Sequence, residues 1–211
     1  MDSKMDDREI LDVLEKAAWD NVKYFSNANK DQRERWVVSK FLSILNVEYR
    51  EEEIRSLEQH SKVDVCFRGA SFQIKELTDP DLLRGKMYKD AYASIKAAKS
   101  LDEVSLIGDV QDVPPIANMY ELVLEMAKEL AGDKSYKTSK GQLDLLIYIT
   151  RTRAFLIQPD EITDEAFSGL GWRSVSFVNE KQAGVLFSSP SAADFLNERA
   201  TMLMSAVPNR D

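Results

Sequence analysis

The segment 63–77, VDVCFRGASFQIKEL, limits the possible folds more than any other, because it reads as two short strands joined by a tight turn. We expect strands over 63–68 and 71–77. Side chains alternate between the two faces of a strand, so Gln73 and Lys75 share one face of the second strand. Buried polar groups destabilise a fold unless they are paired. These polar residues are therefore either exposed residues of an ordinary alternating strand or functional groups of a catalytic or binding site.

Helices and strands alternate along the rest of the chain. The apolar run LDLLIYI, 143–149, indicates a fully buried strand. The remaining pattern predicts helices over 8–25, 31–45, 82–99, 116–132 and 191–204, and strands over 46–49, 104–108, 153–159, 172–178 and 183–189. This order predicts an α/β fold with a mixed central sheet flanked by helices. We expect a single domain over 1–211, with an N-terminal helical extension at 1–27 and a helical insertion at 109–142.

Composition excludes several classes of protein. The 211 residues contain one cysteine, Cys66, so neither an intramolecular disulfide nor a cysteine-based zinc cluster can form. A single histidine, His60, excludes multi-histidine metal sites. No apolar run approaches the roughly 20 residues that span a bilayer, and the acidic start MDSKMDDREI is unlike a secretory signal. We therefore expect a cytoplasmic protein without membrane contact.

The net charge of −8 counts against broad, nonspecific affinity for nucleic acid, because neutralising phosphates requires clustered lysine and arginine. It does not exclude a local basic surface, since the distribution of charge matters more than its sum.

Asp64 lies on the first strand of the hairpin, where it can face Gln73 and Lys75. Magnesium prefers hard oxygen ligands and is usually held by one or two carboxylates with water and phosphate. Asp64 offers a carboxylate, Gln73 an amide oxygen and Ile74 its backbone carbonyl. Lys75 could position or deprotonate an attacking water, so these residues could hydrolyse a phosphodiester. The simpler interpretation is a cross-strand ion pair between Asp64 and Lys75, worth up to ~1 kcal/mol.

Asp64, followed nine residues later by Gln73-Ile74-Lys75, resembles the signature of the PD-(D/E)xK, or restriction-endonuclease-like, superfamily in its QxK variant. RERWVVSKFL followed by the hairpin also resembles a family of uncharacterised bacterial proteins described as endonucleases. The resemblance implies a core of helix, three strands, helix and strand, with the basic helix 82–99 as its second helix. It further implies that Asp64, Gln73 and the Ile74 carbonyl bind Mg²⁺ or Mn²⁺, with Lys75 acting on the water. Glutamine in place of an acid removes a charge and should weaken Mg²⁺ binding.

Further residues enter through the same resemblance. In the superfamily an acid on the helix before the hairpin often completes the metal site, and Glu34 lies at helical spacing from Val38 and Phe41. Basic residues on the helices before and after the hairpin are candidates for contacts with nucleic acid: Arg33, Arg35, Arg84, Lys86 and Lys89.

Several residues have two interpretations. His60 is either an exposed loop residue or a base, and Cys66 either a small core residue or a nucleophile; we favour the first of each. Asp144 is expected to be an ordinary strand-end residue rather than a metal or structural contact. The loop 133–142, with lysines around Tyr136, is either an ordinary loop or a phosphate contact, and we favour the ordinary loop.

The sequence therefore favours a Mg²⁺-dependent endonuclease that acts on nucleic acid, with DNA preferred. A homodimer or a partner protein is expected to compensate for the acidic net charge. The alternative is an inactive nuclease fold that binds nucleic acid or protein, which Gln73 and the net charge of −8 favour. A third reading is a nuclease for RNA or phage-derived nucleic acid, and no residue pattern selects among these substrates.

Overall fold

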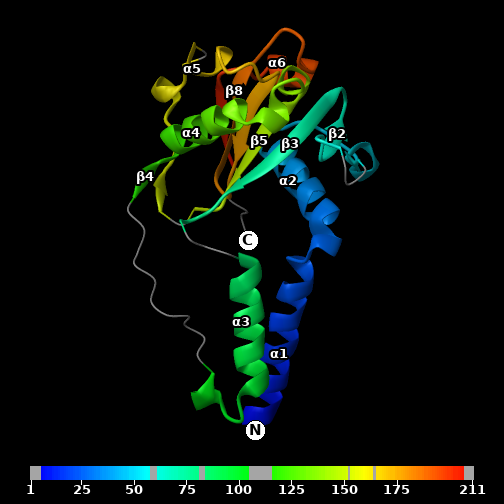
Figure 1. The fold of residues 1–211 in the computed structure, drawn as a ribbon, viewed down its shortest axis with the longest axis vertical. Coiled ribbons are helices and arrows are strands. Elements are labelled where there is room, and N and C mark those ends of the chain that lie inside the picture. Colours follow the sequence, from blue (N-terminus) through cyan, green and yellow to red (C-terminus); the bar gives the residue numbers. More distant parts are fainter. Residues whose placement is uncertain are drawn as a thin grey trace. The chain divides into compact units, whose positions relative to one another are not determined.

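A computed structural model describes residues 6–57, 61–80, 84–104, 116–151, 153–163 and 165–206. The chain divides into two compact units, drawn in Figure 1. The helical unit comprises residues 1–30 and 80–114, and the sheet unit comprises 31–79 and 115–211. The extension expected at 1–27 thus contributes its helix to a unit that also contains the helix after the hairpin. Each unit is described by itself below.

The sheet unit is built on a seven-stranded mixed sheet. Its strand order is β1 (Arg55–Ser56), β2 (Val65–Phe67), β3 (Ala70–Leu77), β5 (Asp144–Ile149), β7 (Ser174–Val178), β8 (Gln182–Ser188) and β9 (Met202–Ser205). The central strands β3, β5 and β7 are parallel, and the other pairings are antiparallel. The structure confirms the predicted α/β fold with a mixed central sheet flanked by helices.

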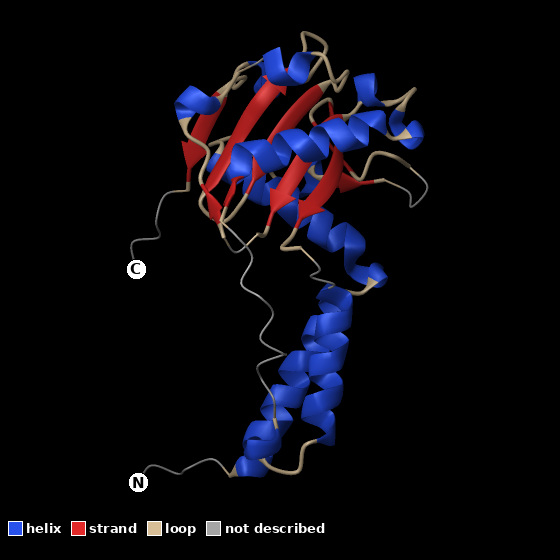
Figure 2. Cartoon of the chain, turned by 60° about the vertical axis from the view of Figure 1, so that its left-hand side comes forward, coloured by secondary structure: helices blue, strands red, loops and turns tan. Residues whose placement is uncertain are grey.

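Two helices cover opposite faces of this sheet, as Figures 1 and 2 show. On one face, α2 (Lys30–Ile44) buries Phe41 and Leu42 against Phe72 and other apolar residues of the hairpin. On the other face, α4 (Met119–Gly132) buries Val123 and Ala127 in the cluster that contains Leu145 and Ile147. β5 is buried on both faces, which explains its continuous apolar sequence.

The hairpin turns through two residues, Arg68 and Gly69, because Phe67 pairs directly with Ala70. Both turn residues have positive φ, 40° and 84°, as the tight turns that match strand twist require. β2 is shorter than the expected strand 63–68. The last paired residues are Val65 and Phe72; beyond them, Asp64 N donates to the Phe72 carbonyl and Ile74 N donates to the Asp64 carboxylate.

The helical unit is an antiparallel pair, α1 (Asp7–Tyr24) and α3 (Arg84–Ala97), followed by the short 3₁₀ helix η3 (Leu101–Glu103). Aromatic contacts hold the pair: Trp19 lies 5.1 Å from Tyr92, and Phe25 stacks on Tyr88 at 4.5 Å, both between ring centroids. A capping box at Asp6 begins α1.

The two helices between β3 and β5 have roles opposite to those expected from the resemblance. Parallel neighbouring strands need a long crossover, usually a helix packed on the sheet. The helix predicted for this role, 82–99, forms α3 in the helical unit. The helix predicted as an insertion, α4, packs on the sheet instead. Its apolar residues Val123 and Ala127 suit that position, whereas α3 is rich in exposed lysines.

Other predictions require smaller corrections. The helix predicted over 191–204 is limited to α6 (Asp194–Asn197), because Thr201, at φ 61°, redirects the chain into β9. The strand predicted over 153–159 is only β6 (Ala154–Phe155), which pairs with β4 (Ala117–Asn118) in a separate two-stranded sheet. Asn118 accepts a hydrogen bond from Tyr120 N and caps α4, so this helix begins at Met119.

The remaining elements are short. No strand forms over 46–49, and the strand predicted over 104–108 lies mostly outside the described residues, as does His60. The shorter helices are η1 (Asn27–Asn29), η2 (Glu51–Glu53), η4 (Lys134–Tyr136), η5 (Lys140–Gln142), η6 (Pro159–Glu161) and α5 (Glu165–Ser168). η4 and η5 lie in the segment predicted to be an ordinary loop.

Candidate active site

The hairpin brings Asp64 and Gln73 into direct contact on the α4 face of the sheet. Both side chains are buried, with exposed fractions of 8% and 6%. Asp64 Oδ2 accepts hydrogen bonds from Gln73 Nε2 at 2.5 Å and from Ile74 N at 2.8 Å. Gln73 Nε2 also lies 3.4 Å from the Ile74 carbonyl oxygen. The end of the Gln73 amide therefore sits between the Asp64 carboxylate and this carbonyl.

The other end of the Gln73 amide contacts Tyr136. The Tyr136 hydroxyl donates to Gln73 Oε1 at 3.3 Å. Tyr136 belongs to η4 and is itself buried, with 7% of its surface exposed. This tyrosine is therefore not an exposed residue of an ordinary loop. The tyrosine instead forms one wall of the site.

Two lysines lie over the same ring. Lys75 Nζ is 5.6 Å and Lys62 Nζ 5.7 Å from the centroid of Tyr136, within the range of cation–π attraction. Asp133 is close to both. Hydrogen bonds from Ser135 lower the pKa of the Asp133 carboxyl, and the positive charges of Lys62 and Lys75 lower it further. Two cations thus lie over the tyrosine that contacts Gln73, and the exposed Asp133 carboxylate interacts with both.

The donor set has the chemistry of a site for a hard cation. Asp64 contributes a carboxylate, the Ile74 carbonyl a neutral oxygen, and Gln73 an amide whose oxygen would join them if the amide turned over. Within the described ranges, no three His, Cys, Asp or Glu side chains gather as metal ligands. A cation here would therefore be bound by neutral oxygens more than by carboxylates. This agrees with the weak Mg²⁺ binding expected from a glutamine at position 73.

Glu34 lies on the first half of α2 and is half-buried. The predicted helical spacing is confirmed, since Val38 and Phe41 are fully buried. However, α2 packs on the face that carries Phe72, whereas Gln73 points to the α4 face. A role of Glu34 beside Asp64 stays a prediction.

The predicted contacts with nucleic acid fall in both units. Arg33 and Arg35 lie on α2 in the sheet unit. Arg84, Lys86 and Lys89 lie on α3 in the helical unit. Their participation in the site of the sheet unit stays a prediction.

Sequence reasoning did not connect three residues with Gln73 and Lys75: Tyr136, Lys62 and Asp133. Tyr136 is 63 positions from Gln73, and no spacing rule connects a loop residue to a strand at that distance. Lys62 offered a weak signal, because it precedes Asp64 by two residues and could have been placed on the same side of the chain.

Asp144 was expected to be an ordinary strand-end residue, but it is fully buried at the centre of a polar network. Arg173 donates to both carboxylate oxygens, and Ser174 Oγ donates to Oδ1 at 2.8 Å. Ser71 N donates to Oδ2 at 2.7 Å, and Arg173 also reaches the Gly69 carbonyl at 3.1 Å. The network ties the hairpin to the first residues of β5 and β7. It therefore holds the strand that carries Gln73 and Lys75.

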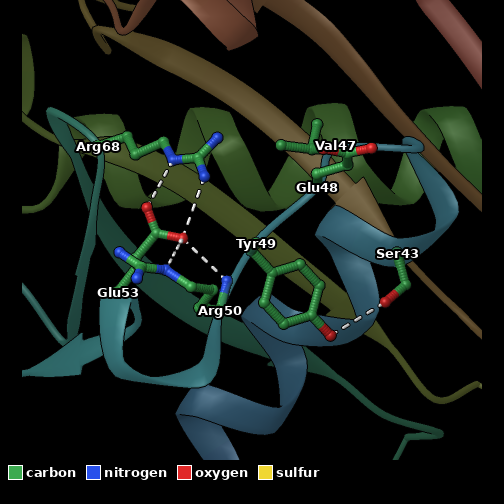
Figure 3. A pocket seen from close by; sticks show the side chains of 7 residues that line it. All are labelled: Ser43, Val47, Glu48, Tyr49, Arg50, Glu53 and Arg68. Carbon is green, nitrogen blue, oxygen red and sulfur yellow. Dashed lines mark hydrogen bonds and ion pairs between the residues drawn. The ribbon is translucent and has the colours of Figure 1, made fainter.

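An open pocket of about 730 Å³ lies near the hairpin turn (Figure 3). It is lined by Ser43, Val47, Glu48, Tyr49, Arg50, Glu53 and Arg68. Arg68 donates to both oxygens of Glu53, at 2.9 and 3.0 Å, and these bonds lower the pKa of the Glu53 carboxyl. Arg50 N donates to Glu53 as well, at 2.8 Å. The central charges of the pocket are thus paired with each other, and none of the candidate site residues lines it.

Among the helices in the described parts of the chain, none combines the length and apolar character needed to cross a membrane.

Comparisons with known proteins add the following. A family model described as "Putative endonuclease, protein of unknown function (DUF1780)" matches residues 6–207. Comparison with curated proteins gave no match. The chain is similar to a solved structure of a protein of unknown function from Pseudomonas aeruginosa strain PAO1, whose description places it in a monooxygenase superfamily. The two are 25% identical over 96% of this chain and 97% of that chain, with a TM-score of 0.59.

Proposed function

The chain belongs to this endonuclease family, and on that premise we propose that it is a Mg²⁺- or Mn²⁺-dependent nuclease of the PD-(D/E)xK type, with DNA as its preferred substrate. One observation carries the proposal. The buried Asp64 carboxylate, the Gln73 amide and the Ile74 carbonyl meet at one point on the hairpin, and Lys75 follows on the same face of β3. This contact between groups that the sequence spaces as D…QxK supports the proposal.

The proposal gives each residue of the candidate site a role. Asp64, Gln73 and the Ile74 carbonyl would hold the metal, with Glu34 as a further carboxylate. When bound there, the metal would polarise a phosphoryl oxygen and acidify a water molecule. Lys75 would orient the attacking water and attract the charge that develops on the phosphate. Lys62, near the same ring, would attract a neighbouring phosphate.

The first test measures cleavage of double-stranded DNA, single-stranded DNA and RNA with Mg²⁺, Mn²⁺ or EDTA. We expect cleavage of DNA that requires a divalent metal and that Asp64→Asn reduces about 100-fold or more, since it removes the one buried carboxylate of the donor set. Asp160→Asn is the matched control, because Asp160 is exposed and lies in η6. Cleavage that persists in EDTA or in Asp64→Asn would contradict the proposal.

A second candidate function has its own supporting observation. The Gln73 amide nitrogen, not its oxygen, faces Asp64. The amide and the carboxylate therefore hydrogen-bond each other without a metal ion. Such a hydrogen-bonded pair fits a nuclease fold that has lost catalysis and that serves as a module binding nucleic acid or protein.

Gln73→Glu distinguishes these two functions. A second carboxylate strengthens a Mg²⁺ site, so in an active nuclease we expect the Mg²⁺ concentration for half-maximal cleavage to fall by about tenfold. Without metal, the two carboxylates repel each other, so Mg²⁺ should raise the melting temperature of the variant more than that of the wild type. If the wild type is inactive and Gln73→Glu cleaves DNA, the binding module is the correct reading of the natural protein.

A further inference from the structure

Trp172 packs against the ring of Tyr136. The Tyr136 ring lies 5.4 Å from that of Trp172, which is only 2% exposed. The Trp172 indole N–H donates to the Ala127 carbonyl of α4 at 3.1 Å. Asp133 accepts a hydrogen bond from Ser135 N at 2.7 Å and begins the 3₁₀ turn that carries Tyr136. The phenol therefore has a fixed position between α4 and the hairpin.

The Tyr136 hydroxyl hydrogen-bonds one end of the Gln73 side-chain amide. A glutamine amide has a donor end and an acceptor end of nearly equal size, so only its hydrogen bonds decide which end faces which neighbour. An ionised carboxylate only accepts hydrogen bonds, so Gln73 Nε2 faces Asp64, and Tyr136 donates to the opposite end of the amide, Oε1. A hydroxyl can also accept, so the same residue would bond Nε2 if the amide turned its oxygen toward a cation beside Asp64.

The ring acts on a second group of the site. The face of an aromatic ring attracts an ammonium group, and the Lys75 nitrogen lies 5.6 Å from the centre of the Tyr136 ring. Lysine has a long, flexible side chain, so such an attraction restricts where its charge is found. Tyr136 thus contacts both the amide and the cation of the D…QxK set.

We propose that Tyr136 is a positioning residue of this site: its hydroxyl anchors the end of the Gln73 amide that faces away from Asp64, and its ring attracts the Lys75 ammonium. The inference rests on the proposed function only for its effect on catalysis. The orienting contacts themselves are properties of the folded chain and can be measured without metal or substrate.

The test compares the side-chain amide ¹⁵N–¹H signals of Gln73 in the wild type and in Tyr136→Phe, without metal. We expect the signals in the variant to shift and broaden, because Gln73 Oε1 loses its donor and that end of the amide is no longer held. Tyr49→Phe is the matched control: the Tyr49 hydroxyl hydrogen-bonds Ser43 at 3.1 Å, away from the site. Unchanged Gln73 signals in Tyr136→Phe, or equal changes in both variants, would overturn the proposal.

Kinetics provide the second readout. In an active nuclease, Tyr136→Phe should lower kcat about five- to tenfold, the value of one hydrogen bond, with KM within about twofold of the wild type. The control Tyr49→Phe should leave both constants unchanged. If the wild type is inactive, the proposed function is wrong. The amide spectra then still test whether Tyr136 holds the Gln73 amide. Altered spectra with an unchanged kcat would overturn the catalytic part of the role.

Discussion

Replacing Asp144 by alanine is expected to lower the free energy of unfolding by about 3–5 kcal/mol, the usual cost of breaking a buried ion pair. The substitution leaves the Arg173 guanidinium, whose side chain is 14% exposed, without its carboxylate. It also removes the acceptor of Ser71 N and Ser174 Oγ. Chemical denaturation followed by circular dichroism measures the effect.

A matched control compares this pair with an exposed one. Glu180 forms an ion pair with Lys40 at 2.6 Å but is 70% exposed, so Glu180→Ala should cost less than about 1 kcal/mol. If Asp144→Ala does not fold, Asp144→Asn retains the shape of the side chain and tests the charge alone. A loss for Asp144→Asn no larger than that for Glu180→Ala would show that the network does not hold the sheet together.

Replacing Lys75 by methionine is expected to lower kcat for nucleic acid cleavage by about 100- to 10,000-fold, while the protein remains folded. Methionine retains most of the apolar stem but removes the charge that we propose attracts the phosphate and orients the water. The measurement is single-turnover cleavage at saturating enzyme, with circular dichroism to verify folding.

Lys181→Met is the control for this change, because Lys181 is exposed at the turn between β7 and β8. Both variants change the net charge equally, so a loss that is confined to Lys75→Met comes from the site. Equal rates in the two variants would contradict the role of Lys75.

Local pattern was enough to predict the hairpin that carries the candidate site. Alternation correctly assigned Phe72 and Ile74 to one face of β3 and Gln73 to the other. The prediction succeeds there because successive side chains of a strand point to opposite faces of the sheet. The same local logic was wrong for 191–204, where pairing with β8 draws Met202–Ser205 into a strand. A strand at the edge of a sheet depends on its neighbour more than on its own residues.

The roles of the two helices after the hairpin were also beyond local pattern. Both α3 and α4 have helical sequences, and only packing determines which of them covers the sheet. Asp144 shows the same limit, because a carboxylate at the start of a buried strand reveals neither its arginine partner nor its burial. Arg173 is 29 positions away, directly before β7.

The sequence by itself determined the α/β class and the mixed sheet, because the order of helices and strands follows from local patterns. It also determined the contact of Asp64 with Gln73, because both residues lie on one hairpin. Only the tertiary structure decided that Tyr136 closes the site, that Lys62 joins Lys75, and that the Asp144 network holds the hairpin in place. Such contacts join segments that are brought together by burial of apolar surface, which is non-directional and does not specify its partners in the local sequence.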